Sequence, residues 1–372
     1  MTAHLVLNFG AFWFLNAAVV YAAEDVSRQC DIYNGNWTPL RRESGVYHYD
    51  NSCPFIDQRQ ACIGKDTSFL EWEWQPNDCN LPLFDPWWFL DLLRNRSIAF
   101  IGDSLGRNQF ESLSCLLAAA EQPQQTGAND DLVVTRRYPA HNVTTVLILS
   151  PFLVEHTPHT YSTHMGHKTV HLDIPDPDWH FQHRSFDVVY FASSGRWFLG
   201  SPKYAMKYTY SRYRQPSAGK VEVAFLPDAN TPWYAMSRAF RTVKRSLKSQ
   251  AVVLWKTYSP SHYTGGAWDS GGHCHRNRYP NNLTAAGVDL DPNVEPLEEV
   301  FGSLINERSL VTKLNVTHMA MPRNDAHPGD LNNIARKSSS AQDCVHWCLP
   351  GIPDVWNRFL LVEIGRRLRE PA

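Results

Sequence analysis

Two short stretches, far apart in the chain, carry side chains capable of nucleophilic catalysis. The stretch FIGDSLGR places Ser104 directly after Asp103, and the stretch DCVHWC places Asp343 three residues before His346. In a helical turn, residues three apart lie on one face. Asp343 can then accept the Nδ1 proton of His346 and leave Nε2 to deprotonate Ser104. This hypothesis makes Ser104 the nucleophile, His346 the base and Asp343 the residue that orients the base.

The structural alternative for the first stretch is an ordinary helix cap, because Asp and Ser are both common N-cap residues. The preceding run SIAFIG is continuously apolar, as expected of a strand buried on both faces. The following run carries Phe110, Leu113, Leu116 and Leu117 on one helical stripe. Ser104 is therefore predicted at the carboxyl end of a strand, where parallel α/β sheets carry their sites. An oxyanion formed there would meet the free N–H groups of a helix N-terminus.

The rest of the chain predicts an α/β fold. Further strands are expected in TVLILSPFLVE, FDVVYFASS and AVVLWKTYS, and TPWYAMSRAFRTVKRSLKS between the last two reads as a crossover helix with a solvated face. Strands that alternate with helices indicate a mostly parallel sheet covered by helices. The stretch IPDVWNRFLLVEIGRRL near the C-terminus predicts an amphipathic helix.

Residues 1–23 contain no Asp, Glu, Lys or Arg and are predicted to be a signal anchor or a signal peptide. Either interpretation sends the chain into the secretory lumen, whereas a buried N-terminal helix is the weakest reading. N-x-S/T sequons fit a lumenal location; they begin at Asn36, Asn95, Asn142, Asn282 and Asn315. The net charge of −2 gives no footprint for nucleic acid, so no nucleic-acid partner is expected.

The chain contains eight cysteines, an even number that suggests four disulfides in an exported protein, although spacing leaves their pairing open. Zinc is the rival interpretation, because GGHCHR and DCVHWC offer Cys and His at short range. Neither stretch has the paired C-x-x-C spacing of a structural zinc site, so no metal is predicted. Residues 24–95 are rich in Cys, Pro, Gly and Trp, and we expect a loop-rich, disulfide-stapled region that packs on a catalytic domain at 96–372.

Many ordered motifs resemble the plant trichome birefringence-like family of wall-polysaccharide O-acetyltransferases, distant relatives of SGNH/GDSL esterases. They are CDIYNGNW, SCPFI, WQPNDCNLP, FIGDSLGRNQFESLSCLL, SPFLVE, SPSHYTGGAWDSGGHC and DCVHWCLPGIPDVWN. The resemblance implies a three-layer α/β/α SGNH-like fold with an N-terminal Cys-rich region, and it assigns the same triad of Ser104, His346 and Asp343. It also implies disulfides Cys30–Cys79, Cys53–Cys115, Cys62–Cys348 and Cys274–Cys344.

One stretch departs from the family pattern. Where the family usually has a Gly-His-Trp-Trp motif, often preceded by Asn, this chain reads FASSGRWF, with Arg196 in the place of His. In SGNH enzymes an Asn in this region commonly helps to form the oxyanion hole. Here the Ser104 backbone N–H is expected to act instead, together with Gly195 or a nearby side chain, Arg107 or Asn108. Asp103 is a further candidate for positioning. Lys256 stands where the family more often has Arg.

The function implied by the resemblance is transfer of acetyl, through an acetyl-serine, to a cell-wall polysaccharide, with xylan or pectin as the expected acceptor. No bound cofactor is expected, but an acetyl donor is required, either acetyl-CoA or another acetylated carrier. The expected location is the Golgi membrane, held through the N-terminal segment with a lumenal catalytic domain, or alternatively the cell wall after secretion. Aromatic residues near the motifs are candidates for lining a glycan groove: Trp197, Trp268, Trp347 and Tyr263. The competing functions are an acetyl esterase with the same triad and a non-catalytic polysaccharide-binding protein.

Overall fold

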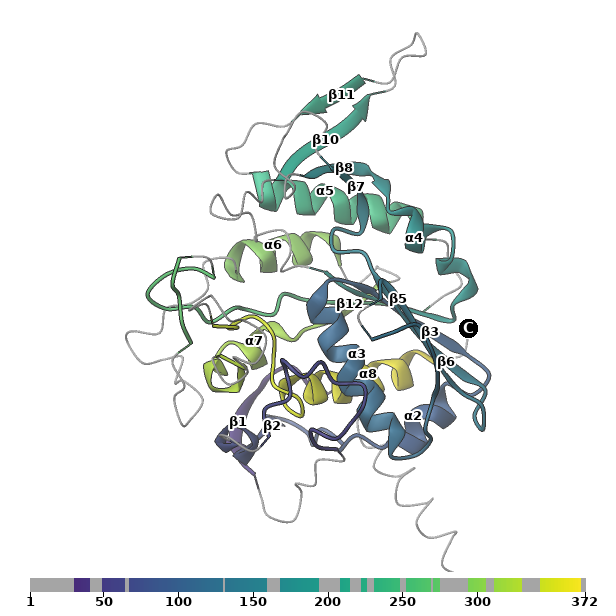
Figure 1. Cartoon of the computed structure of the whole chain (residues 1–372), viewed down its shortest axis with the longest axis vertical. Coiled ribbons are helices and arrows are strands. Elements are labelled where there is room, and N and C mark those ends of the chain that lie inside the picture. Colours follow the sequence, from purple (N-terminus) through teal and green to yellow (C-terminus); the bar gives the residue numbers. More distant parts are fainter. Residues whose placement is uncertain are drawn as a thin grey trace, which may run out of the picture.

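The fold is described from a computed structural model of the 372-residue chain (Figure 1). The structure describes residues 30–40, 49–63, 67–129, 131–158, 168–193, 208–214, 222–225, 231–247, 252–268, 270–274, 294–305, 311–329 and 342–368.

A seven-stranded sheet forms the centre of the molecule. Its strands are β3 (Ser97–Gly102), β4 (Gln124–Thr126), β5 (Val133–Tyr138), β6 (Val143–Leu149), β9 (Val188–Ala192), β12 (Val252–Lys256) and β13 (Val311–Leu314). The strand order is β13-β12-β9-β3-β6-β5-β4. The strands from β13 to β6 run parallel, and β5 and β4 complete the sheet as antiparallel strands. The predicted mostly parallel sheet is confirmed, and the carboxyl ends of β3, β6, β9 and β12 share one edge.

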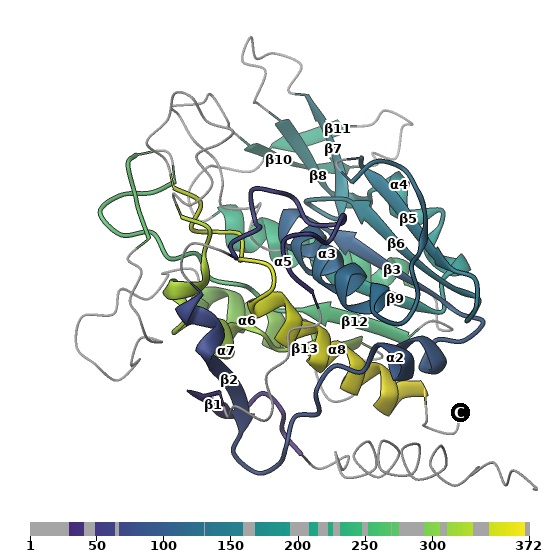
Figure 2. The same cartoon turned by 60° about the horizontal axis from the view of Figure 1, so that its bottom comes forward.

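Helices cover both faces of this sheet. The longer ones are α2 (Pro86–Leu92), α3 (Ser104–Ala118), α5 (Thr231–Ser246), α6 (Val294–Leu304) and α8 (Ile352–Leu368). Side chains alternate along each strand, so Ile98 and Phe100 of β3 join a core with α2, α3 and α8. Ala99 and Ile101 join a second core with α5 and α6. The result is the three-layer α/β/α arrangement, in which α3 and α8 lie side by side (Figure 2).

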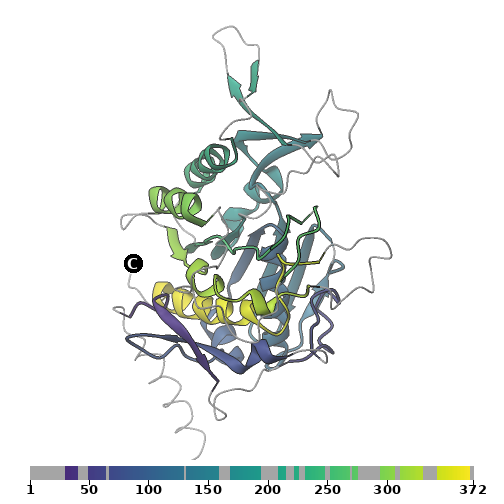
Figure 3. The same ribbon diagram turned by 90° about the vertical axis from the view of Figure 1, so that its left-hand side faces the viewer.

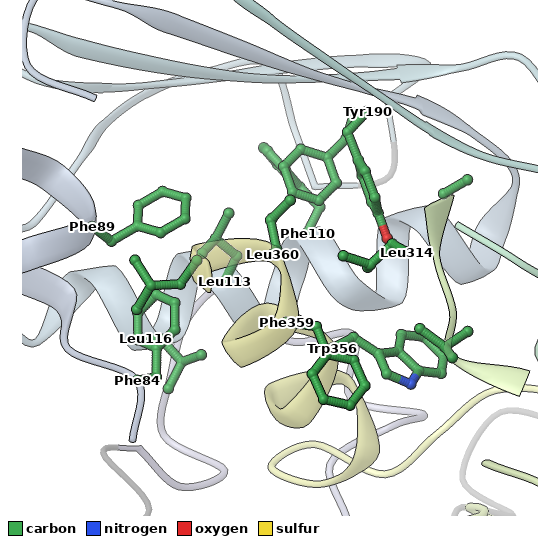
Figure 4. Packing of buried hydrophobic residues seen from close by; sticks show 14 of the residues in the cluster. Phe84, Phe89, Phe110, Leu113, Leu116, Tyr190, Leu314, Trp356, Phe359 and Leu360 are labelled. Atoms are coloured by element: carbon green, nitrogen blue, oxygen red, sulfur yellow. The ribbon is translucent and has the colours of Figure 1, made fainter. Parts of the chain in front are cut away.

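The core between the sheet and the α3–α8 layer is rich in aromatic side chains. Figure 4 shows Phe110 of α3, Tyr190 of β9, and Trp356 and Phe359 of α8 within this layer. All four side chains are buried. Phe100 packs edge-on against both Phe110 and Tyr190, with ring centroids 5.4 and 4.9 Å apart. These contacts fix α3, and with it Ser104, against the centre of the sheet.

Helix α8 differs from its prediction as an amphipathic helix, because it is buried on nearly every side. Its outer face is covered by the N-terminal region. Tyr33 packs edge-on against Phe359 at 5.1 Å, and its hydroxyl donates to Glu363 at 3.1 Å. The Arg358 guanidinium donates to the carbonyl of Leu81 at 2.6 Å. A partner segment distant in the sequence thus hides the helix face that would otherwise be solvated.

The N-terminal region contains one antiparallel pair, β1 (Gly35–Pro39) with β2 (Trp72–Pro76), and a short 3₁₀-helix η1 (Ser68–Glu71). The pair lies beside α7 (Thr317–Ala320), where the Trp37 indole donates to the Met319 carbonyl at 2.7 Å. Disulfides join Cys30 to Cys79, Cys53 to Cys115, Cys62 to Cys348 and Cys274 to Cys344. These are the pairs that the family resemblance implies. Because all eight cysteines are paired, none remains as a thiolate to bind zinc.

A second, four-stranded sheet lies at the end of the molecule opposite the β1–β2 pair (Figures 1 and 3). It consists of β7 (Val154–Pro158), β8 (Lys168–Pro175), β10 (Tyr208–Arg214) and β11 (Glu222–Phe225), in the order β11-β10-β8-β7. The remaining short helices are α4 (Pro177–His180), η2 (His183–Ser185) and η4 (Asn324–Ala326). Helix α5 packs against β8 of this sheet. The strands β8, β10 and β11 were not predicted from the periodicity of the sequence.

Among the helices of the described residues, none has the length and apolar character needed to cross a membrane. The predicted N-terminal signal anchor or signal peptide, residues 1–23, lies outside the described residues.

Candidate active site

The turn between β3 and α3 presents Ser104 to solvent. The Asp103 side chain accepts from the Leu105 N–H at 3.0 Å and is therefore the N-cap of α3. Ser104 is the first helical residue and is exposed. A side chain at Gly102 would overlap the Ala192 carbonyl of β9, so this position requires glycine. Of the two residues that the sequence offered as a cap, Asp103 takes that role and leaves the Ser104 hydroxyl available.

Asp343 and His346 form a hydrogen-bonded pair, with His346 Nδ1 2.9 Å from Asp343 Oδ2. The other carboxylate oxygen accepts the backbone N–H groups of Val345 at 3.2 Å and His346 at 3.0 Å. The prediction that a helical turn aligns the two residues is wrong, because this segment is an irregular turn closed by the Asp343 side chain. The pairing is nonetheless the one needed to leave Nε2 as the reactive nitrogen.

The electrostatics of this pair favour a charged carboxylate beside a basic imidazole. Burial acts to raise the pKa of Asp343, but the His346 charge and its hydrogen bonds outweigh burial and hold that pKa well below its usual range. Burial acts to lower the pKa of His346, but the charge and hydrogen bond of Asp343, aided by Asp103, raise it above its usual value. A raised pKa strengthens His346 as a base.

Asn108 brings the histidine segment to the first turns of α3. Its Nδ2 donates to the Trp347 carbonyl at 3.1 Å, and its Oδ1 accepts the Trp347 N–H at 2.9 Å. Residues four apart share a helix face, so Asn108 lies one turn below Ser104 on the same side of α3. His346, which immediately precedes Trp347, is therefore held near the N-terminus of this helix. Within the described residues, no hydrogen bond joins the Ser104 hydroxyl to the His346 ring, and in many enzymes this contact tightens only when substrate binds.

Two disulfides brace the same segment. Cys344 follows Asp343 directly and is bonded to Cys274, and Cys348 lies two residues after His346 and is bonded to Cys62. The Leu349 N–H also donates to the Gln60 carbonyl at 2.8 Å. Such bracing limits displacement of the base, and in enzymes about 1 Å of misplacement can cost about 100-fold in rate.

The predicted oxyanion donors have different roles in the structure. Asn108 is fully buried, and its amide is engaged by the Trp347 backbone and by Gln60 Oε1 at 2.6 Å, so it holds the chain rather than facing an oxyanion. The Arg107 guanidinium donates to the carbonyls of Asn129 and Asp131 at 2.8 and 2.7 Å and supports their loop. Gly195 lies outside the described residues. The Ser104 backbone N–H at the start of α3 remains the candidate donor.

The aromatic residues predicted to line a glycan groove differ in their burial. Trp347 is fully buried, its indole N–H donates to Ser259 Oγ at 2.8 Å, and it belongs to the core. Tyr263 and Trp268 are partly exposed, and the Tyr263 hydroxyl donates to the Gln342 carbonyl at 3.2 Å next to Asp343. Trp197 lies outside the described residues. Tyr263 thus contacts the segment that carries Asp343 and His346.

Lys256 is a buried cation at the carboxyl end of β12, and its side chain is 1% exposed. Its Nζ lies 4.5 Å from the centroid of the Trp356 ring, and the Asp103 carboxylate is its main electrostatic partner. Burial lowers the pKa of Lys256 to about 8, against the raising effect of Asp103. Among the described residues, no cluster of three or more His, Cys, Asp or Glu side chains forms a metal site.

The fold and the site define an α/β/α protein of the SGNH type with a serine at a strand–helix turn and an Asp–His pair near the C-terminus. The model of the GDSL/SGNH-like acyl-esterase family found in Pmr5 and Cas1p matches residues 81–363, and the chain belongs to this family. The PMR5 N-terminal domain matches residues 28–80.

Named plant proteins are similar over most of their length. The chain is 35% identical to xyloglucan O-acetyltransferase 1 of Arabidopsis thaliana, over 91% of this chain and 80% of the relative. It is 34% identical to protein trichome birefringence-like 25 of Arabidopsis thaliana, over 92% of this chain and 78% of the relative. It is 32% identical to xyloglucan O-acetyltransferase 4 of Populus trichocarpa, over 91% of this chain and 81% of the relative.

Proposed function

We propose that this chain is a polysaccharide O-acetyltransferase in which Ser104 is the nucleophile, His346 the general acid–base and Asp343 the residue that orients and stabilises His346. The observation that carries the proposal is the 2.9 Å Asp343–His346 pair, tethered through Asn108 to the helix that begins with exposed Ser104. A positioned base and a solvent-facing hydroxyl at a helix N-terminus are the parts needed for acyl transfer.

In the first step, His346 Nε2 removes the Ser104 proton as Oγ attacks the acetyl carbonyl of the donor. The oxyanion develops beside the Ser104 backbone N–H and the positive end of α3, which stabilise it. The bond from the acetyl carbon to the carrier then breaks, and His346 gives its proton to the departing carrier. The product is acetyl-Ser104, and Asp343 stabilises the transient imidazolium through its hydrogen bond to Nδ1.

In the second step, a sugar hydroxyl of the acceptor attacks the acetyl carbon of acetyl-Ser104. His346 removes the proton of that hydroxyl and returns it to Oγ as the serine ester breaks. Transfer competes with hydrolysis by water, so the acceptor must be held with one hydroxyl close to the ester. Bound and oriented hydroxyls gain the large effective concentrations that give transfer its advantage.

Xyloglucan is our proposed acceptor class. Two relatives that cover most of this chain are named xyloglucan O-acetyltransferases, at 35% and 32% identity. This replaces xylan or pectin, expected from family resemblance, as the first acceptor to test. Those two polymers belong in the same panel, because catalytic residues do not specify the acceptor.

The test incubates the purified protein with an isotopically labelled acetyl ester, with and without xyloglucan, xylan and pectin oligosaccharides. Mass spectrometry should detect labelled acetyl on xyloglucan oligosaccharides. Ser104→Ala should lower the rate by roughly 10⁴-fold or more. Ser185→Ala is the matched control, because Ser185 is exposed and precedes β9 at the opposite edge of the sheet, and it should keep the rate. Undiminished transfer by Ser104→Ala would refute the proposal.

An acetyl esterase with the same triad is the second candidate, because the matching family model is described as acyl-esterase. It predicts release of free acetate at a rate that the oligosaccharides do not change, without labelled glycan. A glycan-binding protein would bind oligosaccharides but show neither product, and Ser104→Ala would leave its function in plants unchanged.

We also propose a lumenal location, with the chain held in the Golgi membrane by residues 1–23. The apolar N-terminal run, the disulfides and the exposed sequon residues Asn36, Asn95 and Asn142 support it. In the producing plant cell, the protein should carry glycosidase-sensitive sugars and co-fractionate with Golgi membranes. Recovery from the cell-wall fluid would favour secretion, and an unglycosylated cytosolic protein would exclude both.

A further inference from the structure

A pair of histidines adjoins the proposed base but takes no part in the chemistry described above. His262 follows β12 in a partly buried loop, and His327 follows η4 and is 1% exposed. The two rings meet with His262 Nδ1 2.7 Å from His327 Nε2. The outer nitrogens face backbone carbonyls: His262 Nε2 lies 2.9 Å from Met321 O, and His327 Nδ1 lies 2.7 Å from His346 O. A chain of three short contacts thus ends on the backbone of the proposed base.

The number of protons in this chain follows from hydrogen-bond chemistry. A carbonyl oxygen can only accept, so His262 Nε2 and His327 Nδ1 must each carry a proton. The two facing nitrogens need one proton between them, because two lone pairs or two N–H groups at 2.7 Å would repel each other. Three protons on two rings make one imidazole and one imidazolium. The pair therefore carries a single positive charge when all three hydrogen bonds are formed.

The surroundings suit this shared charge. The His327 ring stacks on Trp347 with centroids 4.1 Å apart, and the His262 ring meets the same indole edge-on at 5.8 Å. A cation near an indole is stabilised by the ring electrons. Burial, followed by the neighbouring charge of His262, holds the pKa of His327 well below its usual range. His262 is also the less buried of the two rings, so we assign the extra proton to His262 and treat His327 as the neutral partner that donates through Nδ1.

Other charged groups face the pair from the segments packed around it. Asp343 and His346, both on the segment that follows residue 341, interact electrostatically with His327. On the segment that carries His327, Asp325 is bound to Arg323 by a buried salt bridge of 2.8 Å. Among the described residues, Asp343 is a carboxylate that acts on the charge of the pair, and it also orients His346.

We propose that His262 and His327 form a positioning pair that shares one positive charge and holds the backbone carbonyl of His346. The Asp343 carboxylate anchors the N–H of His346, and His327 anchors its carbonyl, so the backbone of the base is fixed on both sides. The backbone N–H of His262 also donates to the Cys344 carbonyl at 3.0 Å, within the turn that carries His346. Neither ring contacts reacting atoms; the pair acts through His346. This inference rests on the proposed role of His346.

The activity test uses two substitutions of His327 in the full-length protein. His327→Asn retains a donor where Nδ1 stood and should keep kcat near the wild-type value. His327→Phe retains a ring against Trp347 but removes the donor. It should lower kcat about 10- to 100-fold, with the acceptor KM changed less than about twofold. Equal losses in both variants, or an equal rise in KM, would indicate a general packing role and overturn the proposal.

A spectroscopic readout tests the proton count without activity. In protein labelled with ¹⁵N-histidine, ring-nitrogen signals that disappear in His262→Gln and His327→Asn identify the pair among the 16 histidines. Near neutral pH they should show one doubly protonated ring and one singly protonated ring. Two singly protonated rings would overturn the shared charge. Inactive Ser104→Ala with fully active His327→Phe would sink this inference alone, whereas active Ser104→Ala would sink the proposed function.

Discussion

Replacement of Asn108 by alanine tests whether the contact between α3 and the histidine segment builds the site. The side chain is fully buried and bonds both backbone groups of Trp347 as well as Gln60 Oε1. The substitution leaves at least two buried backbone groups without partners, at about 1–3 kcal/mol each. The free energy of unfolding should therefore fall by roughly 2–6 kcal/mol, a large part of the about 5–15 kcal/mol typical of a domain.

Activity should fall with stability, because His346 directly precedes the residue that loses its anchor. A shift of about 1 Å in the ring would lower kcat about 100-fold. The assay combines denaturant unfolding, followed by circular dichroism, with acetyl transfer at a temperature where the variant is fully folded. Measuring kcat on the folded variant separates misplacement of the base from simple loss of folded protein.

Asn77→Ala is the matched control. Asn77 also has two side-chain hydrogen bonds, with Asn36 at 3.0 Å and Asn34 at 3.1 Å, but it is exposed and lies in the N-terminal region. It should change the unfolding free energy by no more than about 0.5 kcal/mol and leave kcat unchanged. The reasoning would be refuted if Asn108→Ala matched this control in both measurements.

The remaining predictions concern pH and disulfides. The raised pKa of His346 places the acid limb of the kcat/KM profile above about pH 6.5, since the base must be neutral. Asp343→Asn should move that limb to lower pH. A limb that stays in place would contradict the assignment of His346 as the base oriented by Asp343. The pKa of Lys256 is about 8 in the folded chain and about 10.4 when unfolded, so between these pH values the unfolded chain binds more protons and Lys256 makes the unfolding free energy rise with pH. In denaturation series at about pH 8 and pH 10.4, Lys256→Met should remove that rise. An unchanged dependence of the unfolding free energy on pH would count against a buried ammonium. Replacing Cys62 and Cys348 by alanine should lower the free energy of unfolding by about 2–5 kcal/mol and should also lower kcat. Replacing Cys30 and Cys79 by alanine should lower the free energy of unfolding alone. Equal effects of the two double variants on kcat would argue against bracing of His346 by the disulfide.

The strand–turn–helix that presents Ser104 could be predicted because its signals are local. An apolar run, a glycine and a capping aspartate lie next to one another at the start of a helical stripe. The disulfide pairs followed from family resemblance, since the cysteine spacing alone was compatible with many pairings. These features need little knowledge of the rest of the fold.

The features that were missed depend on contacts between distant residues. Asn108 was expected to face an oxyanion, but its partner Trp347 lies 239 residues away and no sequence pattern links them. Helix α8 lost its solvated face to the N-terminal region. His327 stands alone in a loop, and only the fold shows that it meets His262 and the His346 carbonyl.

The most direct test of the central claim is to trap the acyl-enzyme. Brief incubation with an activated acetyl ester, acid quenching and peptide mass spectrometry should find one added acetyl group on the peptide that contains Ser104. The modified fraction should fall when xyloglucan oligosaccharide is added and should be absent from Ser104→Ala and His346→Ala. Acetyl transfer to the oligosaccharide at full rate with no acetyl on Ser104 would contradict the account.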